Sequence, residues 1–515
     1  MVCTYQLRGA NVTVFRQYRE FRDEVSLLLC DEALRVIWAY SRYLEDDDFQ
    51  MPTDIEISEQ FIALDHHGKW ITQWDLEILA KEIILNAGDF RLFYRSLRIW
   101  NGLANTVNSM KKFDENISGV RRENILIELN RIAHRQFTWQ ENSAVPMLVR
   151  HYDIFNTAAI NEMCLAHLGL SVDQIYLCGI AFVSIYLQEF FLKIPFPSEI
   201  PALTENVVRN FLSFTCRTMP ELRNILQTEQ KYYKSFFYAY NSLRAYPLIR
   251  MKNEGKDSIV CPLPTLLIWR FTAGLYYELY GDKGFANAFG RSFQEYIGRA
   301  IARACPGERL HLLAEQRYGT KKARKASVDW IVSDEEAAIF LECKAKRPSW
   351  GTKVALDDLG ALEADFDHMA NAIIQLYKTI GEYQRGQYGQ FSFEVGRKIY
   401  PVVVTLENWH IFLETAQKIH ELVVQKLSAI RVSPHVLEEM PYSIWYVGDL
   451  EAGMQVINEI GIRRFMDGKI CDPEMRHWEW RSYMTQMFKG KFSRKKFFLE
   501  GYDAIFAKII GRSNC

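Results

Sequence analysis

Apolar residues recur three and four positions apart through most of residues 1–245, which predicts a mainly helical N-terminal region. The first such run covers residues 15–43. It stops at Asp46, Asp47 and Asp48, which we interpret as a solvated loop because adjacent like charges repel one another. Further helices are predicted at residues 74–86, 122–134 and 158–168, and another begins at Thr204.

A capping signal precedes the last long segment of this region. Thr218 and Glu221 have the spacing of a capping box, and Pro220 suits the first helical turn. We therefore predict a helical segment that begins here and ends near Leu243. The segment is rich in Tyr and Phe from residue 232 onwards. Such rings could stack on unpaired bases, but aromatic residues of a helix mostly pack in the core, and we favour packing.

The pattern changes at residues 248–261, where two short runs flank an Asn-Glu-Gly-Lys sequence and predict a β-hairpin. Pro262 and Pro264 then precede an apolar run at residues 266–279, which predicts a helix. We interpret residues 246–283 as the junction between the helical region and a second region that contains strands.

Strand alternation is clearest at residues 327–346, where two apolar runs surround an acidic turn. If two glutamates form the turn, antiparallel pairing places Asp329 opposite Glu342, with their Cβ atoms about 4.5–5.5 Å apart. Lys344 shares the same face of the hairpin because strand side chains alternate with period two. Two carboxylates and one ammonium group are therefore expected to converge at the end of this hairpin.

Such a trio suits the metal-dependent hydrolysis of phosphodiesters. Two carboxylates can hold Mg²⁺ while the ion keeps several waters, and the ion lowers the pKa of an attacking water. A lysine can orient that water or stabilise charge that develops on the phosphate. Acid-x-Lys triplets also occur at residues 229–231, 254–256 and 467–469, but without an apolar strand and an acid-bearing partner strand. An edge hairpin with solvated charges is the alternative interpretation.

Asp329, with Glu342-Cys343-Lys344 at the end of a hydrophobic strand, resembles the active-site motif of the PD-(D/E)XK nuclease superfamily, which has the restriction-endonuclease-like fold. The Leu-Glu-Cys-Lys sequence at residues 341–344 is most similar to that of the Mrr-like and archaeal Holliday-junction-resolvase-like branches. Val328 stands where the family motif has proline, a departure that is frequent among its members.

The resemblance implies an α-β-β-β-α-β core over about residues 284–406. Residues 284–304 match its first helix and residues 311–318 its first strand, and the Asp329 and Glu342 strands follow. Residues 361–385 match the second helix and residues 399–406 the fourth strand. We therefore expect an α/β restriction-endonuclease-like core at residues 284–410, preceded by a large, mainly α-helical domain at residues 1–245. Residues 411–515 are expected to form a C-terminal α/β extension packed on that core.

The resemblance also implies roles for individual residues. Asp329, Glu342 and Lys344 would be the catalytic residues. Asp329 and Glu342 would bind Mg²⁺ or Mn²⁺ together with the main-chain carbonyl of Cys343. Relatives often carry a glutamate in the first helix that completes the metal site, and Glu295 stands where it is expected.

Further residues are expected around this site. Gln375 and Tyr377 of the second helix match a Gln and a Tyr that many relatives carry nearby. Basic residues flank the two acidic strands, and we read them either as contacts to the phosphate backbone or as solubilising loops. These residues are Lys321, Lys322, Arg324, Lys325, Lys346 and Arg347. A basic run at residues 489–496 could contact nucleic acid or a partner, or form a charged helix face.

Composition narrows the class of protein. A chain of 515 residues with 49% hydrophobic residues predicts two or three folded domains. The formal net charge of −1 means that any surface for nucleic acid must be local. The ten cysteines have no zinc-ligand spacing, which favours a reducing compartment. The N-terminus lacks the pattern of a signal peptide and no apolar run is long enough to span a bilayer, so we predict a cytoplasmic protein that does not bind a membrane.

The function expected from these features is a metal-dependent DNA endonuclease, and the resemblance to the superfamily implies a setting in prokaryotic restriction or anti-phage defence. Cutting both strands usually needs two sites, so we expect a homodimer or a higher oligomer, and an activating protein partner is compatible with the large helical region. Two alternatives remain at this point. One is an RNA-directed nuclease with the same site. The other is a non-catalytic nucleic-acid-binding or assembly protein with the same fold, although the intact Asp-Glu-Lys set argues against it.

Overall fold

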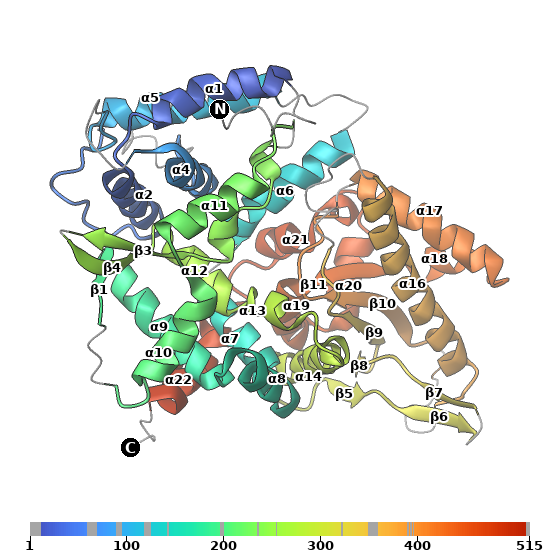
Figure 1. Ribbon diagram of the computed structural model, residues 1–515. Helices are drawn as coiled ribbons and strands as arrows, with labels where there is room; N and C mark the ends of the chain where they lie inside the picture. Colours follow the sequence, from blue (N-terminus) through green and yellow to red (C-terminus); the bar gives the residue numbers. More distant parts are fainter. Residues whose placement is uncertain are drawn as a thin grey trace. The chain divides into compact units, whose positions relative to one another are not determined.

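The protein is a mixed α/β chain whose residues fall into two compact units (Figure 1). The first unit comprises Met1–Tyr152, Asn161–Asp282 and Ile505–Cys515, and the second comprises Asp153–Ile160 and Lys283–Ala504. The computed structural model describes residues 12–58, 70–88, 95–117, 125–141, 144–195, 200–233, 236–253, 255–320, 323–348, 359–388, 391, 394, 396–411 and 413–510. The division after residue 282 falls at the end of the predicted junction. The junction itself therefore lies in the first unit.

The chain up to this division is mainly helical. Its helices are α1 (Val12–Val25), α2 (Cys30–Glu45), α4 (Gln73–Asn86), α5 (Trp100–Ile117), α6 (Ile125–Glu141), α7 (Ala144–Phe155), α8 (Ala158–Leu168), α9 (Val172–Tyr186), α10 (Glu205–Thr215), α11 (Met219–Glu229), α12 (Pro264–Phe271) and α13 (Leu275–Leu279). Within the described part of the chain, no single helix is both long and apolar enough to cross a membrane. One bent pair, α8 with α9, passes that test only when the two helices are taken together.

A small sheet accompanies these helices, with strand order β1-β4-β3-β2. The predicted hairpin is present as β3 (Leu248–Asn253) and β4 (Lys256–Val260), which pair antiparallel. The outer strands are β1 (Phe191–Lys193), antiparallel to β4, and β2 (Cys216–Thr218), parallel to β3.

Helix α4 lies in the core of the first unit because it is apolar on nearly every side. Its charged residues are consequently buried and need partners. Glu77 accepts two hydrogen bonds from the Arg244 guanidinium, at 2.6 and 2.7 Å, and Glu82 accepts one from the hydroxyl of Tyr18 at 2.9 Å. The helix begins at a capping box in which Thr72 is the N-cap residue.

Two predicted helices of this unit are shorter than expected. The capping box of Thr218 and Glu221 is present, but α11 ends at Glu229 instead of continuing to residue 243. Two short 3-10 turns follow, η2 (Phe236–Tyr238) and η3 (Ser242–Arg244). The irregular backbone lets Phe236 and Phe237 both pack on Phe113 of α5, with ring centroids 5.1 Å apart in each pair. The interpretation of this aromatic stretch as core packing holds for these two rings, which are buried.

The second shortened helix is the one predicted at residues 266–279. It is interrupted after Phe271 and resumes at Leu275, giving α12 and α13. The hydroxyl of Thr272 donates to the carbonyl of Ile268, and the main-chain N–H of Gly274 donates to the carbonyl of Trp269. Contacts of this kind divert the chain from the regular helical ladder.

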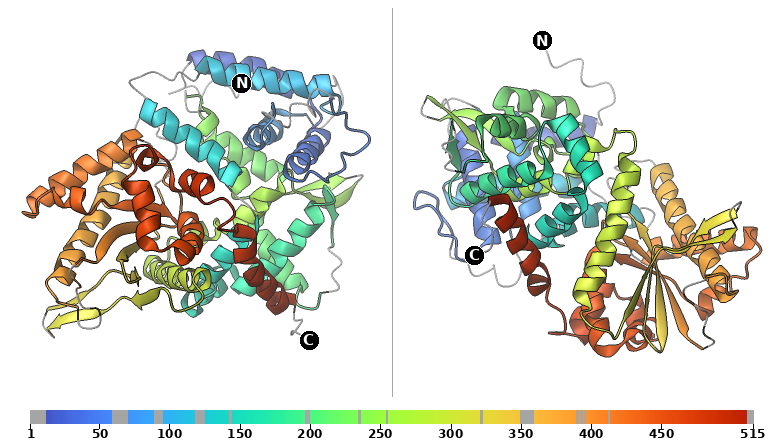
Figure 2. Two further views of the ribbon diagram at one scale, coloured as in Figure 1. Left: turned by 180° about the vertical axis from the view of Figure 1, so that it is seen from behind. Right: turned by 90° about the horizontal axis from the view of Figure 1, so that it is seen from below.

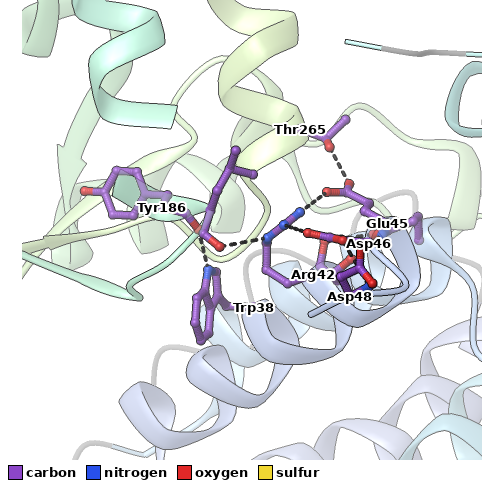
Figure 3. Close-up of polar contacts among 10 residues, drawn as sticks. Trp38, Arg42, Glu45, Asp46, Asp48, Tyr186 and Thr265 are labelled. Atoms are coloured by element: carbon purple, nitrogen blue, oxygen red, sulfur yellow. Dashed lines mark hydrogen bonds and ion pairs between the residues drawn. The ribbon is translucent and has the colours of Figure 1, made fainter. Parts of the chain in front are cut away.

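A buried arginine joins α2 to the end of α9 (Figure 3). Arg42 donates to the carbonyl of Leu187 at 3.2 Å and forms ion pairs with Glu45 at 3.2 Å and Asp46 at 3.0 Å. Trp38, one turn earlier on α2, donates its indole N–H to a main-chain carbonyl at the end of α9. The loop that begins at Asp46 is partly exposed, as predicted for the three aspartates. Asp46, the first residue of that loop, forms an ion pair with Arg42.

The second unit is built on a five-stranded sheet of order β11-β10-β9-β8-β5. Along the chain come α14 (Phe285–Ala304), β5 (His311–Ala314), β6 (Arg317–Thr320), β7 (Ala323–Ala326), β8 (Trp330–Ser333), β9 (Ala337–Lys344), α16 (Leu359–Gln384), β10 (Lys398–Thr405), α17 (Leu413–Ala429), α18 (Val436–Glu439), β11 (Ser443–Tyr446), α19 (Val447–Ile460), α20 (Ile462–Ile470), η4 (Met475–His477), α21 (Trp480–Met487) and α22 (Arg494–Ile510). Strands β5, β8 and β9 pair antiparallel, whereas β9, β10 and β11 run parallel.

The strand predicted at residues 311–318 is two strands. β5 ends at Ala314, and Arg317 begins β6, which pairs with β7 as a separate two-stranded ribbon. Figure 1 shows this ribbon projecting beyond the sheet. The segment that we predicted as a basic loop before Asp329 thus contains a strand.

Helices α16 and α14 cover opposite faces of the five-stranded sheet, as can be followed in Figure 2. Phe340 of β9 packs on Tyr383 of α16 with ring centroids 5.1 Å apart. Trp330 of β8 pairs with Leu341 in the ladder and therefore points to the other face. There its indole N–H donates to the carbonyl of Gln294 in α14 at 2.8 Å. Even-numbered residues of β9 consequently face α16.

Candidate functional site

The β8–β9 hairpin has the register that the sequence predicts. Ser333 pairs with Ala338, and the connection between the strands is tight. Continuing the register by one pair beyond Trp330 places Asp329 across from Glu342. Asp329 lies just outside β8, and its Oδ2 accepts the main-chain N–H of Cys343 at 2.7 Å. The carboxylate thus accepts a main-chain hydrogen bond in place of a backbone carbonyl of the sheet, and this bond fixes it to β9.

Glu342, Lys344 and Gln375 form a hydrogen-bonded group on the α16 face of the sheet. Lys344 Nζ donates to Glu342 Oε1 at 2.7 Å and to Gln375 Oε1 of α16 at 3.4 Å. The lysine and the glutamate meet because they are two residues apart on one strand. The structure therefore brings together Asp329, Glu342, Lys344 and one of the two predicted residues of the second helix.

Glu342 is buried, with 3% of its surface exposed. Its second carboxylate oxygen, Oε2, is buried and has no hydrogen-bond partner among the described residues. The pKa of Glu342 is raised to about 7, mainly by burial and also by the nearby charge of Asp329, while Lys344 opposes the rise. An uncompensated buried carboxylate oxygen is costly unless a cation or a proton occupies it.

Burial also raises the pKa of Asp329, although the N–H of Cys343 opposes that effect. The same hydrogen bond orients Cys343. In an extended strand, the N–H and C=O of one residue point to the same edge, because paired residues exchange both hydrogen bonds. The Cys343 carbonyl accordingly points toward the Asp329 side, where the resemblance implies that it binds metal. Its thiol is buried, which raises the pKa of Cys343.

A third carboxylate, which the sequence did not single out, belongs to this row. Glu315 follows β5, and continuing the β5–β8 register by one pair places it across from Asp329. It is exposed and accepts a hydrogen bond from Gln294 at 3.2 Å. Its charge raises the pKa of both Asp329 and Glu342. The signal available in the sequence was an acid on the strand that precedes the hairpin, but its role depends on strand order.

His368 is a second residue that the sequence did not single out. It lies on α16 seven residues before Gln375, and this spacing places both on the same face of the helix. Its Nε2 is buried and has no hydrogen-bond partner among the described residues. Burial lowers the pKa of His368, and the positive charges of Lys346 and Lys344 lower it further. The imidazole is therefore harder to protonate than an exposed histidine.

Glu295 and Tyr377 are the two remaining residues that the resemblance places at the site. Glu295 is exposed on α14, which covers the sheet face opposite to Glu342. Its predicted part in the metal site stays a prediction. Tyr377 is buried, and its hydroxyl donates to the carbonyl of Met440. Two residues on a helix point about 200° apart, so Tyr377 cannot face the site when Gln375 does.

Two of the predicted basic residues before Asp329 lie on the β6–β7 ribbon. Arg324 and Lys325 belong to β7 and are exposed, and Lys325 forms an ion pair with Glu382 of α16. Lys321 and Lys322 lie outside the described residues. The ribbon is therefore attached to α16, the helix that also contributes Gln375.

The two basic residues after β9 differ from each other. Lys346 is partly exposed and forms an ion pair with Asp365 at 3.0 Å. Arg347 is buried, with 6% of its surface exposed, and its Nε lies 3.3 Å from Glu407. In this structure its guanidinium faces the protein interior instead of a phosphate backbone, because the segment after β9 packs against that of Glu407. The predicted binding of nucleic acid by either residue stays a prediction.

The donor set fits a hard divalent cation. Asp329 and Glu342 supply carboxylate oxygens, the Cys343 carbonyl points to the same side, and Glu342 Oε2 has no hydrogen-bond partner in the described part of the chain. Among the residues that the structure describes, no group of three or more His, Cys, Asp or Glu side chains is placed to hold a metal ion. An ion with two protein carboxylates would complete its shell with waters and substrate phosphate, as Mg²⁺ commonly does.

Comparison with known proteins gives no match. The chain matches no protein-family model, no curated protein shows significant similarity to it, and no solved structure matches its fold significantly. What can be said of its function therefore rests on its own residues and geometry.

Proposed function

We propose that this protein is a metal-dependent endonuclease that hydrolyses phosphodiester bonds of DNA. The observation that carries the proposal is the buried carboxylate of Glu342, which lies in a row with Asp329 at the sheet end and has one oxygen that no described residue contacts by a hydrogen bond. Lys344 lies directly beside it. A divalent cation would offset this concentration of negative charge and would supply the Lewis acid for phosphodiester hydrolysis.

The fold of the second unit supports the proposal. The chain order α14, β5, β8, β9, α16, β10 corresponds to the α-β-β-β-α-β order of the restriction-endonuclease-like core, with the β6–β7 ribbon inserted after β5. The acids lie at the end of the central antiparallel strands, and α14 and α16 lie on the two faces. We propose this core as the catalytic part of the chain.

Each residue has a defined part in the proposed reaction. Asp329 and Glu342, with the Cys343 carbonyl, would hold Mg²⁺ or Mn²⁺, which supplies a Lewis acid for the phosphate and lowers the pKa of the attacking water. Lys344 lies between Glu342 and Gln375, so its ammonium group is held in place to donate a hydrogen bond to that water or to a phosphate oxygen. Gln375 keeps the lysine in that position.

The remaining parts of the proposal concern the setting. All the described cysteines are free thiols, which supports the cytoplasmic compartment predicted from the sequence. We propose that two copies act together on a duplex, because one site cuts one strand at a time. A role in prokaryotic restriction or anti-phage defence, and an activating partner, remain proposals from the resemblance alone.

The test is a cleavage assay with purified full-length protein on supercoiled plasmid, linear duplex, single-stranded DNA and RNA, each with Mg²⁺, Mn²⁺ or EDTA. Wild type is compared with Asp329→Ala and Lys344→Ala. The matched control is Glu335→Gln, an exposed acid at the other end of the same hairpin. We expect metal-dependent cleavage of DNA that both site variants abolish and the control retains. Cleavage that persists undiminished in both site variants would refute the assignment, and cleavage of RNA alone would change the substrate class.

A further inference from the structure

The two faces of the β6–β7 ribbon differ: one contacts α16 and the other carries exposed arginines. Tyr318 pairs with Lys325 across the ribbon, and both side chains bind the carboxylate of Glu382 in α16, through the tyrosine hydroxyl and the lysine ammonium group. One carboxylate thus fastens both strands of the ribbon to the helix that carries Gln375. The orientation of the ribbon relative to the sheet is therefore set by side chains on this face.

Two arginines occupy the other face of the ribbon. Arg317 alternates with Tyr318 along β6, and Arg324 alternates with Lys325 along β7, so both arginines point away from Glu382. Both are exposed. Their positions are diagonal neighbours in the antiparallel ladder, which places their Cβ atoms about 7–8 Å apart. The positively charged side chains of Arg317 and Arg324 therefore lie close together on this face.

These arginines line a groove of about 590 Å³ between the ribbon and the sheet. Its walls are residues 312–318 and Arg324, which include the outer strand β5 and Glu315. Strand β5 is the last strand of the sheet on this side. Glu315 lines this groove, and its charge acts on Asp329 and Glu342, so one end of the groove lies near the row of carboxylates.

We propose that this groove binds the sugar-phosphate backbone of one nucleic-acid strand and leads it to the carboxylate row. The inference rests on the proposed function, because it names the path of the substrate to that site. Arg317 and Arg324 would bind consecutive parts of the phosphate backbone, which is the contact that supplies most sequence-independent affinity. Charge complementarity favours this occupant over a peptide strand added to β5, which would need no pair of arginines.

A local groove of this kind would let a chain with a net charge of −1 bind a polyanion. The positive surface is local, and the ribbon that carries it is attached through Glu382 to α16, the helix that carries Gln375. Glu315 at the groove end would repel a phosphate unless a cation lies between them, so divalent metal should strengthen binding at this end.

The experiment separates binding from cleavage. Fluorescence anisotropy of a labelled single-stranded oligonucleotide is measured in EDTA over a salt series, with the full-length protein. The groove variant is Arg317→Gln/Arg324→Gln. The control, Lys418→Gln/Arg476→Gln, removes two exposed positive charges elsewhere in the second unit. Circular dichroism and thermal unfolding establish that each variant is folded, and plasmid cleavage with Mn²⁺ is measured in parallel.

We expect the groove variant to bind roughly tenfold more weakly or worse, with a salt slope smaller by about 1.4 because two contacts to a single strand are lost. The control should bind like wild type. If the groove variant and the control have equal affinity and equal salt slope, the proposal that the groove binds nucleic acid is wrong, even if wild type cleaves DNA. Binding that depends on the groove, without cleavage by wild type under any metal, would support the groove and count against the proposed nuclease. Capture of a β-strand peptide at β5 that the arginine changes do not affect, with no binding of nucleic acid, would also overturn the proposal.

Discussion

Replacing Glu342 by glutamine should make the metal-free protein more resistant to unfolding as the pH rises. Burial and the neighbouring Asp329 raise the pKa of Glu342 to about 7 from an ordinary value of 4.5. Below pH about 4.5 the carboxyl is protonated in both the folded and the unfolded protein, so it has no effect on stability. Between these two values the unfolded chain loses its proton while the folded protein keeps it. The free energy of unfolding of wild type therefore falls as pH rises through this window.

The magnitude follows from the size of the pKa difference. Each pKa unit corresponds to about 1.4 kcal/mol, so the roughly 2.5 units at Glu342 amount to about 3 kcal/mol once the pH is above 7. About 2.5 kcal/mol of that change falls between pH 5 and pH 8. The variant Glu342→Gln has no proton to lose and lacks this change. A glutamine amide can still accept from Lys344, and any constant effect of the amide cancels when two pH values are compared.

The assay is urea unfolding of the metal-free protein at pH 5, 6, 7 and 8, followed by tryptophan fluorescence. The quantity of interest is the free energy of unfolding of Glu342→Gln minus that of wild type, which should rise by about 2.5 kcal/mol across the series. Glu335→Gln, at the exposed turn of the same hairpin, should show no comparable rise. A difference that stays constant with pH would refute the reasoning, because Glu342 would then titrate normally.

Three further predictions concern positioning and packing. Gln375→Ala removes the second partner of Lys344 and should slow cleavage roughly tenfold or more without weakening substrate binding. Tyr377→Phe should cleave like wild type because the Tyr377 hydroxyl contacts Met440. Slower cleavage by Tyr377→Phe than by Gln375→Ala would contradict this geometry. Gly298→Ala would place a Cβ 2.2 Å from the Trp330 ring, so we expect about 1–3 kcal/mol of lost stability in urea unfolding, and no loss would mean that α14 does not pack closely behind β8. Arg42→Met removes a buried guanidinium that pairs with the partly exposed Glu45 and Asp46 and donates to the Leu187 carbonyl, and should cost about 2 kcal/mol of unfolding free energy. A loss under about 0.5 kcal/mol would show that these contacts do not stabilise the fold.

Local signals were sufficient for the part of the site that lies on one hairpin. A short acidic turn between two alternating runs determined the register, and that register alone placed Asp329 across from Glu342 and Lys344 beside it. The capping box at Thr218 likewise determined where α11 begins. Predictions of this kind depend on neighbours in the chain, where turn length and strand periodicity leave little freedom.

Other features depend on the packing of distant segments, which the chain pattern does not specify. Glu315 joins the row only because β5 pairs with β8, and the sequence alone does not give the order of strands in a sheet. Arg347 reads as a surface cation but packs against Glu407. The strand predicted at residues 311–318 divides because residues 317–320 pair with β7 and not with the sheet. The helix expected to reach residue 243 ends at Glu229, since Phe236 and Phe237 gain more from core packing than from helical geometry.

The measurement that tests the central claim most directly is the binding of Mn²⁺ to the full-length protein at pH 8, monitored by electron paramagnetic resonance. It depends on neither a substrate nor an activating partner. The account predicts Mn²⁺ binding that both Asp329→Asn and Glu342→Gln weaken by at least tenfold, while Glu335→Gln binds like wild type. Mn²⁺ binding that is unchanged in both site variants, or absent from wild type, would contradict the claim that these two carboxylates form a metal centre.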